Sequence, residues 1–118
     1  MNTPPRIDPK AMDLLRSLEA DSPGSVRELV RLFVTDAPGQ LLRIEQGCQA
    51  GNTEQARQAA HFIRSGAMAL GLTATAEASL VVERMPAEDY GHASERVATL
   101  RTELANARVA LLAAIEEV

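Results

Sequence analysis

Residues 52–71 carry the pattern that most constrains this chain, because it predicts one long amphipathic helix. Apolar side chains recur there at steps of three and four, the spacing of the buried face of an α-helix. Asn52 is a favourable N-cap with Gln55 three residues later, and Gly71 is typical of the position just past a helix C-terminus. The pattern therefore predicts a core helix. Its buried stripe consists of Ala56, Ala59, Ala60, Ile63, Ala67 and Leu70.

The chain has 118 residues, enough for one domain with a modest core. Residues 1–7 lack a helical pattern and are expected to form a flexible N-terminus, so the predicted domain spans residues 8–118. Its first helix begins with Asp8 as N-cap and Pro9 in the first helical position. We expect this short helix to cover one end of a bundle.

The second helix is predicted to start after a capping box formed by Ser25 and Glu28. Its apolar positions keep their phase across Pro38, which favours one long helix kinked near residues 35–38. Two helices broken at Asp36 are the alternative. The apolar positions are Val26, Val30, Phe33, Ala37, Leu41, Ile44 and Cys48.

Two more helices complete the predicted set. Thr73 caps the fourth helix, Pro86 ends it, and residues 86–91 are expected to form a loop. Residues 93–117 repeat in heptads, which occur in dimeric coiled coils and in bundles; among several helices of similar phase, a monomeric bundle is favoured. The predicted stripe of the fourth helix is Ala74, Ala78, Val81 and Met85, widened by Leu80 and Val82.

Composition agrees with a helical fold and excludes several functions. The chain has no Trp, one Tyr and two Phe, which favours close-packed helices over a sheet. We therefore predict an all-α, up-down antiparallel four-helix bundle with an additional N-terminal helix. A net charge of −4 argues against non-specific nucleic-acid binding. No membrane-spanning run or signal peptide is recognisable, so a cytoplasmic protein without membrane contact is expected.

Catalytic and metal-binding motifs are missing from the sequence. The single cysteine, Cys48, lies on the core face of its helix and is expected to be a small buried residue. The two histidines show no metal-ligand spacing, and no glycine-rich phosphate loop exists. We therefore expect no cofactor or metal of its own and no autonomous kinase activity.

One histidine lies on the outer face of the central helix. His61 should point away from Ile63, with Arg57 four residues before it, Arg64 three after it and Ser65 four after it. A lone helix histidine is usually an ordinary surface residue, but two guanidinium groups beside an imidazole outline a receptor for an anionic group. His92, which has acidic neighbours, is expected to be solvated.

The run from His61 to Gly71 resembles the phosphohistidine motif of histidine-containing phosphotransfer (HPt) domains. That motif has a basic residue at +3, a small residue at +4 and Leu-Gly at +9 and +10. Arg64 stands where the family most often has Lys, and Ser65 where it most often has Gly. Arginine keeps the charge but replaces a compact ammonium by a planar fork.

The resemblance implies a phosphocarrier of a multistep two-component phosphorelay. His61 would accept a phosphoryl group from a receiver-domain aspartyl phosphate and pass it to another receiver, Arg64 would neutralise phosphoryl charge, and Ser65 would give access. Response regulator receivers and a hybrid sensor histidine kinase are the implied partners, with Mg²⁺ supplied by the receiver. The alternative is an HPt-like module that docks and regulates a receiver or kinase without phosphotransfer. A sensor kinase dimerisation domain is disfavoured because Phe62, and not an acid, follows the histidine.

The outward face around His61 is also a candidate docking surface. Exposed apolar side chains beside small residues are typical of a protein contact. Packing at the edge of the bundle is the other interpretation, mainly for Phe62. The predicted docking residues are Arg57, Gln58, Phe62, Met68 and Ala69.

Overall fold

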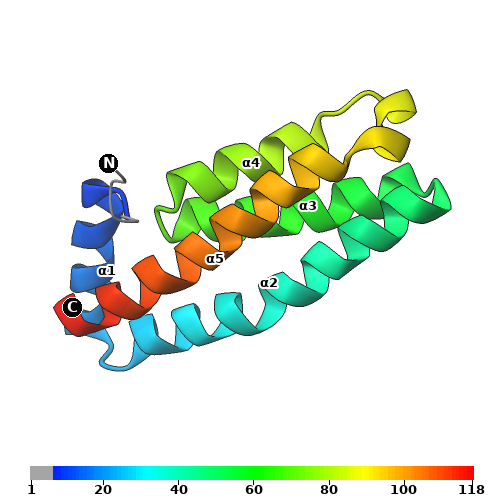
Figure 1. Ribbon diagram of the computed structural model, residues 1–118. Helices are drawn as coiled ribbons and strands as arrows, with labels where there is room; N and C mark the ends of the chain where they lie inside the picture. The colour runs from blue at the N-terminus through cyan, green and yellow to red at the C-terminus, as the bar shows by residue number, and fades with distance from the viewer. Residues whose placement is uncertain (1–6) are drawn as a thin grey trace.

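The computed structural model describes residues 7–118, which form six helices and no strand. Helices α2 to α5 run alternately up and down in an antiparallel bundle, and α1 lies across one end (Figure 1). The predicted fold class is therefore confirmed. The elements are α1 (Pro9–Asp21), α2 (Ser25–Ala50), α3 (Thr53–Ala69), α4 (Thr73–Glu83), the short 3-10 helix η1 (Ala87–His92) and α5 (Ser94–Glu117).

The central helix has the buried face that the sequence predicts. All six positions of its stripe are buried. The first four pack with α2, α4 and α5 around Ile44, Val82 and Leu100, and Ala67 and Leu70 belong to a second core cluster that α1 joins. Cys48 lies half-buried at the edge of this core, and burial raises the pKa of its thiol. None of the helices within residues 7–118 is long and apolar enough to cross a membrane.

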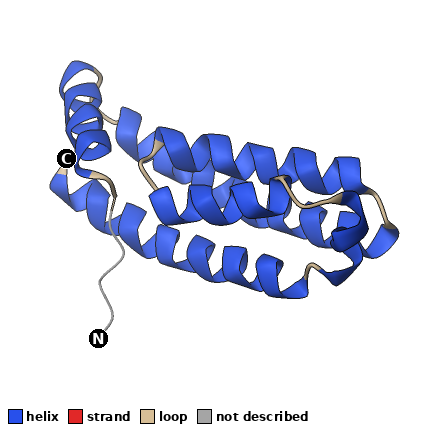
Figure 2. Ribbon diagram, turned by 90° about the horizontal axis from the view of Figure 1, so that it is seen from above, coloured by secondary structure: helices blue, strands red, loops and turns tan. Residues whose placement is uncertain are grey.

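Gly71 fixes both the α3–α4 turn and the position of α1. Its φ of +71° is readily adopted only by glycine, and a Cβ there would clash with Ala11 of α1. The backbone N–H of Asp8 donates to the carbonyl of Gly71 at 2.9 Å. Figure 2 shows α1 crossing the end of the bundle as a result. Residues 1–6 of the predicted flexible N-terminus lie outside the described residues, and Ile7 is partly buried against the core.

The predicted capping box at Ser25 is wrong. Gly24 is the N-cap of α2, with a left-handed backbone (φ +91°), and Ser25 is already helical. The carboxylate of Glu19, near the end of α1, accepts hydrogen bonds from the backbone N–H groups of Gly24 (2.7 Å) and Val26 (3.3 Å). An acid from the preceding helix thus satisfies two N–H groups at the start of α2, whereas the N–H groups of Ser25 and Glu28 donate to the backbone carbonyls of Ser22 and Gly24.

Other helix ends agree more closely with the prediction. Helix α2 is continuous through Pro38, so the alternative of two separate helices is wrong. Asn52 caps α3 as predicted, because its side chain accepts from the N–H of Gln55 at 3.1 Å. Asp8 is the N-cap of α1 but makes no side-chain capping bond, and Thr73 is the first residue of α4 instead of its cap.

The buried face of α4 differs from the predicted stripe. Ala74 and Val81 are exposed, whereas Thr75 and Ser79 are buried. Their hydroxyls are satisfied by backbone: Ser79 donates to the carbonyl of Thr75 at 2.8 Å, and Thr75 donates to that of Glu103 in α5 at 3.3 Å. Apolar residues occur around most of α4, so hydrophobic periodicity did not define its phase, and two small hydroxyl residues face the core.

Candidate functional site

His61 lies near the middle of α3 on the side away from the core. Its side chain is 57% exposed, whereas Ala60 and Ile63 beside it are fully or almost fully buried. The predicted exposure of the imidazole on a rigid helix is therefore confirmed. No described residue forms a hydrogen bond with its Nε2 atom.

A carboxylate that the sequence analysis missed lies against His61. Glu83, the last residue of α4, places Oε2 3.0 Å from Nδ1 of His61 and accepts a hydrogen bond from Nε of Arg64 at Oε1 (2.7 Å). Nη2 of Arg64 lies 3.1 Å from the same Nδ1 atom. These three side chains, hereafter the His61 cluster, connect α3 to α4 beside an open ring nitrogen.

The cluster is more shielded from water than an ordinary surface ion pair. The side chains of Arg64 and Glu83 are 23% and 21% exposed, so their attraction is screened less than that of a fully exposed pair. Burial raises the pKa of the Glu83 carboxyl, but the hydrogen bonds and charges of Arg64 and His61 outweigh it and the pKa is lowered overall. Glu83 is therefore ionised at neutral pH.

Glu83 could have been found from the symmetry of the helical hairpin. His61 and Glu83 each lie eleven residues from Leu72 in the turn between α3 and α4. In an antiparallel hairpin, residues equally distant from the turn lie at the same height. Helix order alone therefore brings position 83 level with the histidine, although it does not decide that the two side chains meet.

Arg57 is engaged in a different contact from the one that the sequence suggested. Its Nε donates to the hydroxyl of Tyr90 at 3.2 Å, its Nη2 donates to the carbonyl of Met85 at 2.8 Å, and its guanidinium carbon lies 5.3 Å from the Tyr90 ring centroid. Tyr90 is buried in η1, within the segment predicted to be a loop. Arg57 thus ties α3 to η1 and does not take part in the His61 cluster.

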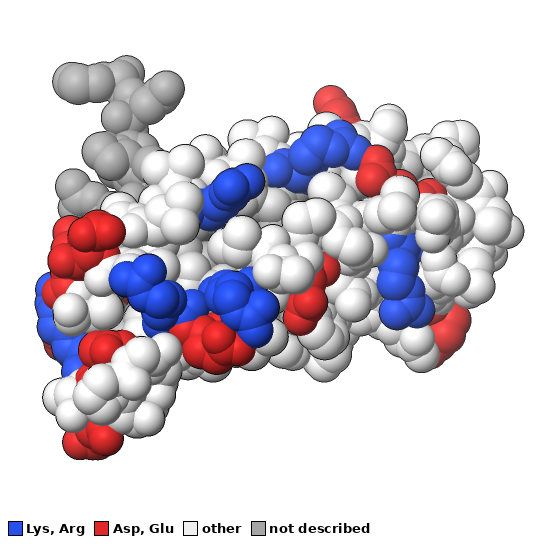
Figure 3. Space-filling model, turned by 90° about the horizontal axis from the view of Figure 1, so that it is seen from below, with Lys and Arg blue, Asp and Glu red and all other residues white. Residues whose placement is uncertain are grey.

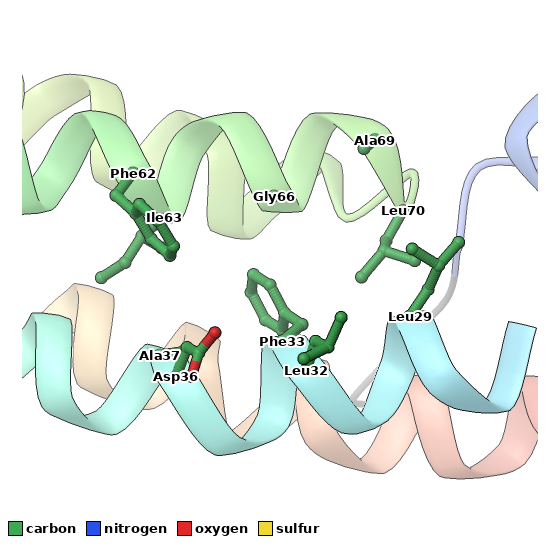
Figure 4. Close-up of a pocket in the computed structure, with 10 residues that line it drawn as sticks. All are labelled: Leu29, Leu32, Phe33, Asp36, Ala37, Phe62, Ile63, Gly66, Ala69 and Leu70. Carbon is green, nitrogen blue, oxygen red and sulfur yellow. The ribbon is translucent and has the colours of Figure 1, made fainter.

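The predicted docking residues fall on two sides of His61. Phe62, which is 52% exposed, and Ala69 line a groove of about 270 Å³ between α2 and α3. Figure 4 shows Phe62 above this groove and Phe33 rising from α2 into it. A Cβ at Gly66 would lie 2.9 Å from the Phe33 ring, so the glycine makes room for this aromatic side chain. The groove is otherwise apolar except for Asp36.

On the other side of His61, Met68 is 61% exposed and lines a depression shared with α1 and α4. Its sulfur accepts a long contact from Nη1 of Arg64 at 3.5 Å. Gln58 is exposed and donates to Glu54 at 3.0 Å, and Ser65 is exposed one position beyond Arg64. Exposed apolar surface therefore flanks the imidazole on both sides.

Comparison with known proteins identifies the family. The protein-family model of the Hpt domain matches residues 28–115, which contain all of α3 and the whole His61 cluster. This chain belongs to the Hpt domain family. The crystal structure of histidine-containing phosphotransfer protein B (HptB) from Pseudomonas aeruginosa PAO1 covers 98% of this chain and 99% of that one, with a TM-score of 0.77 and 21% identity. That likeness supports the Hpt fold. No curated protein matches the chain.

Family membership establishes the general activity. Hpt domains are histidine-containing phosphotransfer proteins, which carry phosphoryl groups in phosphorelays and are not autonomous kinases. The face of the molecule seen in Figure 3 has Lys and Arg side chains interspersed with Asp and Glu. Within residues 7–118, no group of three or more His, Cys, Asp or Glu side chains could hold a metal ion.

Proposed function

We propose that His61 is the phosphoacceptor of this Hpt domain. It takes a phosphoryl group from an aspartyl phosphate of a response regulator receiver domain and passes it to another receiver, in a relay that a hybrid sensor histidine kinase starts. The observation that carries this proposal is the exposed imidazole in the middle of α3, with Nδ1 beside Glu83 and Arg64 and with Nε2 bonded by no described residue. Nε2 is then the nitrogen that forms the bond to phosphorus.

The chemistry requires positioning and charge neutralisation more than acid–base catalysis. In the proposal, the receiver supplies the aspartate and Mg²⁺, and this chain supplies a rigid nucleophile and one adjacent cation. Arg64 fills the second role because its Nη2 atom lies beside the imidazole while its Nε atom donates to Glu83. A guanidinium there balances charge on the phosphoryl oxygens as the group arrives.

The receiver docks over the exposed face of α3. Phe62 and Met68 expose more than half of their surface on the α3 face that carries His61, so both are available to a partner that covers the imidazole. Ser65 lies between them in sequence, and its small side chain leaves room for the partner's active-site loops. Gln58 and Ala69 extend the same face.

Phosphotransfer from a radiolabelled phosphorylated receiver tests the proposal. The wild-type protein should gain an acid-labile, base-stable label, His61→Gln should gain none, and His92→Gln, which changes the exposed histidine of η1, should behave as wild type. Label persisting on His61→Gln would show that His61 is not the acceptor. A wild-type protein that binds the receiver yet takes no label would instead support the regulatory binding module.

A further inference from the structure

Met68 differs in exposure from the other methionines within residues 7–118. It is 61% exposed, whereas Met12 and Met85 are 7% and 3% exposed. The rate at which a methionine side chain is oxidised follows its access to oxidants dissolved in water. Met68 is therefore the first of these three methionines that an oxidant in solution reaches.

The sulfur of Met68 contacts the arginine of the His61 cluster. Met68 lies four residues after Arg64 on the same side of α3, and its Sδ atom accepts a long contact from Nη1 at 3.5 Å. The other guanidinium nitrogens have stronger partners, since Nε donates to Glu83 at 2.7 Å and Nη2 lies 3.1 Å from Nδ1 of His61. A thioether sulfur is only a weak acceptor. Nη1 is thus the nitrogen that Arg64 can turn most easily toward a phosphoryl oxygen.

Oxidation by a peroxide would change the character of this contact. A lone pair of Sδ attacks one oxygen of hydrogen peroxide, the O–O bond breaks, and its electron pair leaves with the second oxygen as hydroxide. The hydroxide takes the proton of the transferred oxygen and becomes water. Sulfur loses two electrons and the peroxide gains them. The product is a sulfoxide, so a polar oxygen stands where the side chain previously offered a soft sulfur.

We infer that Met68 is a redox-sensitive modification site, and that its sulfoxide binds Nη1 of Arg64 and withholds that nitrogen from the phosphoryl group. The inference rests on the proposed role of Arg64 beside His61 and adds a form of regulation to it. A hydrogen bond from a guanidinium group to a sulfoxide oxygen is charge-assisted, so it is stronger than the sulfur contact that it replaces. The methionine side chain is flexible, so either sulfoxide epimer can reach the guanidinium group.

Two other sulfur groups serve as internal comparisons. Met85 also accepts from an arginine, Nη1 of Arg96 at 3.1 Å, but it is buried in the core of the bundle. Cys48 is half-buried, and burial raises the pKa of its thiol, which leaves little of the reactive thiolate at neutral pH. Both groups should therefore react with peroxide more slowly than Met68.

Peptide mass spectrometry after brief treatment with dilute hydrogen peroxide tests the site. Met68 should gain one oxygen well before Met12, Met85 or Cys48. The two methionine sulfoxide reductases, one for each epimer, should remove that oxygen again. Circular dichroism should show unchanged helix content, because the oxygen is added at the surface. Oxidation of Met85 or Cys48 ahead of Met68 would overturn the inference.

Transfer from a phosphorylated receiver tests the consequence for Arg64. At saturating receiver, the oxidised wild type should transfer about three- to tenfold more slowly, the size expected for one competing hydrogen bond, and should recover after reduction. Met68→Leu cannot form a sulfoxide, so its own rate should be the same before and after peroxide. Met68→Gln places an amide oxygen near the guanidinium group and should transfer more slowly than Met68→Leu without any peroxide.

The Arg64→Ala variant separates an effect on the cation from an effect on docking. Peroxide should oxidise Met68 in this variant but should not slow its transfer further, because the group that the sulfoxide withholds is missing. A further loss of the same size there would overturn the inference. So would a wild type in which oxidation weakens receiver binding and leaves the rate at saturating receiver unchanged. Absence of transfer in the untreated wild type would instead refute the acceptor role of His61, while the mass spectra still report the reactivity of Met68.

Discussion

Arg57 and Arg64 lie on the same helix on either side of His61, four residues before it and three after it, yet the structure engages them in different ways. Arg57 donates to the Met85 carbonyl and to the hydroxyl of a buried tyrosine. Arg64 donates to the carboxylate of Glu83 and lies beside the imidazole. The first contact joins two helices, and the second belongs to the site.

The difference comes from the hydrogen-bond acceptors that the end of α4 and η1 place beside each arginine. Beyond Glu83 the α-helix stops, so the Met85 carbonyl has no intrahelical donor and Arg57 satisfies it. Two residues earlier, at Glu83, the neighbouring helix offers a charged side chain instead of a free carbonyl. The helix packed against a basic residue therefore decides whether that residue has a structural or a functional role. Its spacing from the histidine along its own helix does not decide this.

The largest effect on transfer should come from a bulky side chain at position 65, next to Arg64, because it would block the partner's access to His61. Ser65→Leu should lower receiver binding and reduce transfer by at least about a hundredfold, since a displacement of ~1 Å from the reactive geometry can cost that much. Its thermal stability should stay within about 0.5 kcal/mol of wild type, as for other surface changes.

Ser65→Gly is the matched control for this experiment. It should preserve or increase transfer, at a helix-propensity cost of roughly 0.5–1 kcal/mol. Equal receiver affinities for the Ser, Gly and Leu proteins, measured by calorimetry, would mean that the partner does not cover this part of α3.

An intermediate effect is expected when the charge of the site arginine is reversed. Arg64→Glu should slow transfer by about ten- to a hundredfold, because ~1.4 kcal/mol of lost transition-state stabilisation corresponds to tenfold. It places a second acid beside Glu83 and the incoming phosphoryl group, while circular dichroism should show unchanged helix content.

Arg108→Glu, the same charge change on an exposed residue of α5, should transfer at the wild-type rate. If Arg64→Glu also transfers at that rate, the basic residue at this position is a surface charge without a role in the chemistry.

The sequence was sufficient wherever a local pattern and the packing agreed. The stripe of α3 has a single phase, so the exposure of His61 on its opposite face was predictable. The buried face of α4 was not predictable, because apolar residues occur around most of that helix. Its two buried hydroxyl residues also carry no hydrophobic signal.

The residues of the site also divide into those that a local pattern predicts and those that only the packing of helices reveals. His61 and Arg64 are neighbours along one helix and were found from their spacing. Glu83 approaches them from another helix, so only the pairing of α3 with α4 reveals it. The contact of Arg57 with Tyr90 was missed for the same reason, because the tyrosine lies 33 residues further along the chain in a segment expected to be a loop.

The smallest effect on transfer should come from Arg57, and this prediction tests the comparison most directly. Arg57→Met keeps much of the side-chain length but removes the donors to Met85 and Tyr90, so the protein should lose about 1–2 kcal/mol of stability in urea unfolding while transferring within about twofold of wild type. A double-mutant cycle with Tyr90→Phe should show coupling, since the two side chains share a hydrogen bond. If Arg57→Met instead slows transfer as much as Arg64→Glu and leaves stability unchanged, then both arginines serve the phosphoryl group and the division drawn between them is wrong.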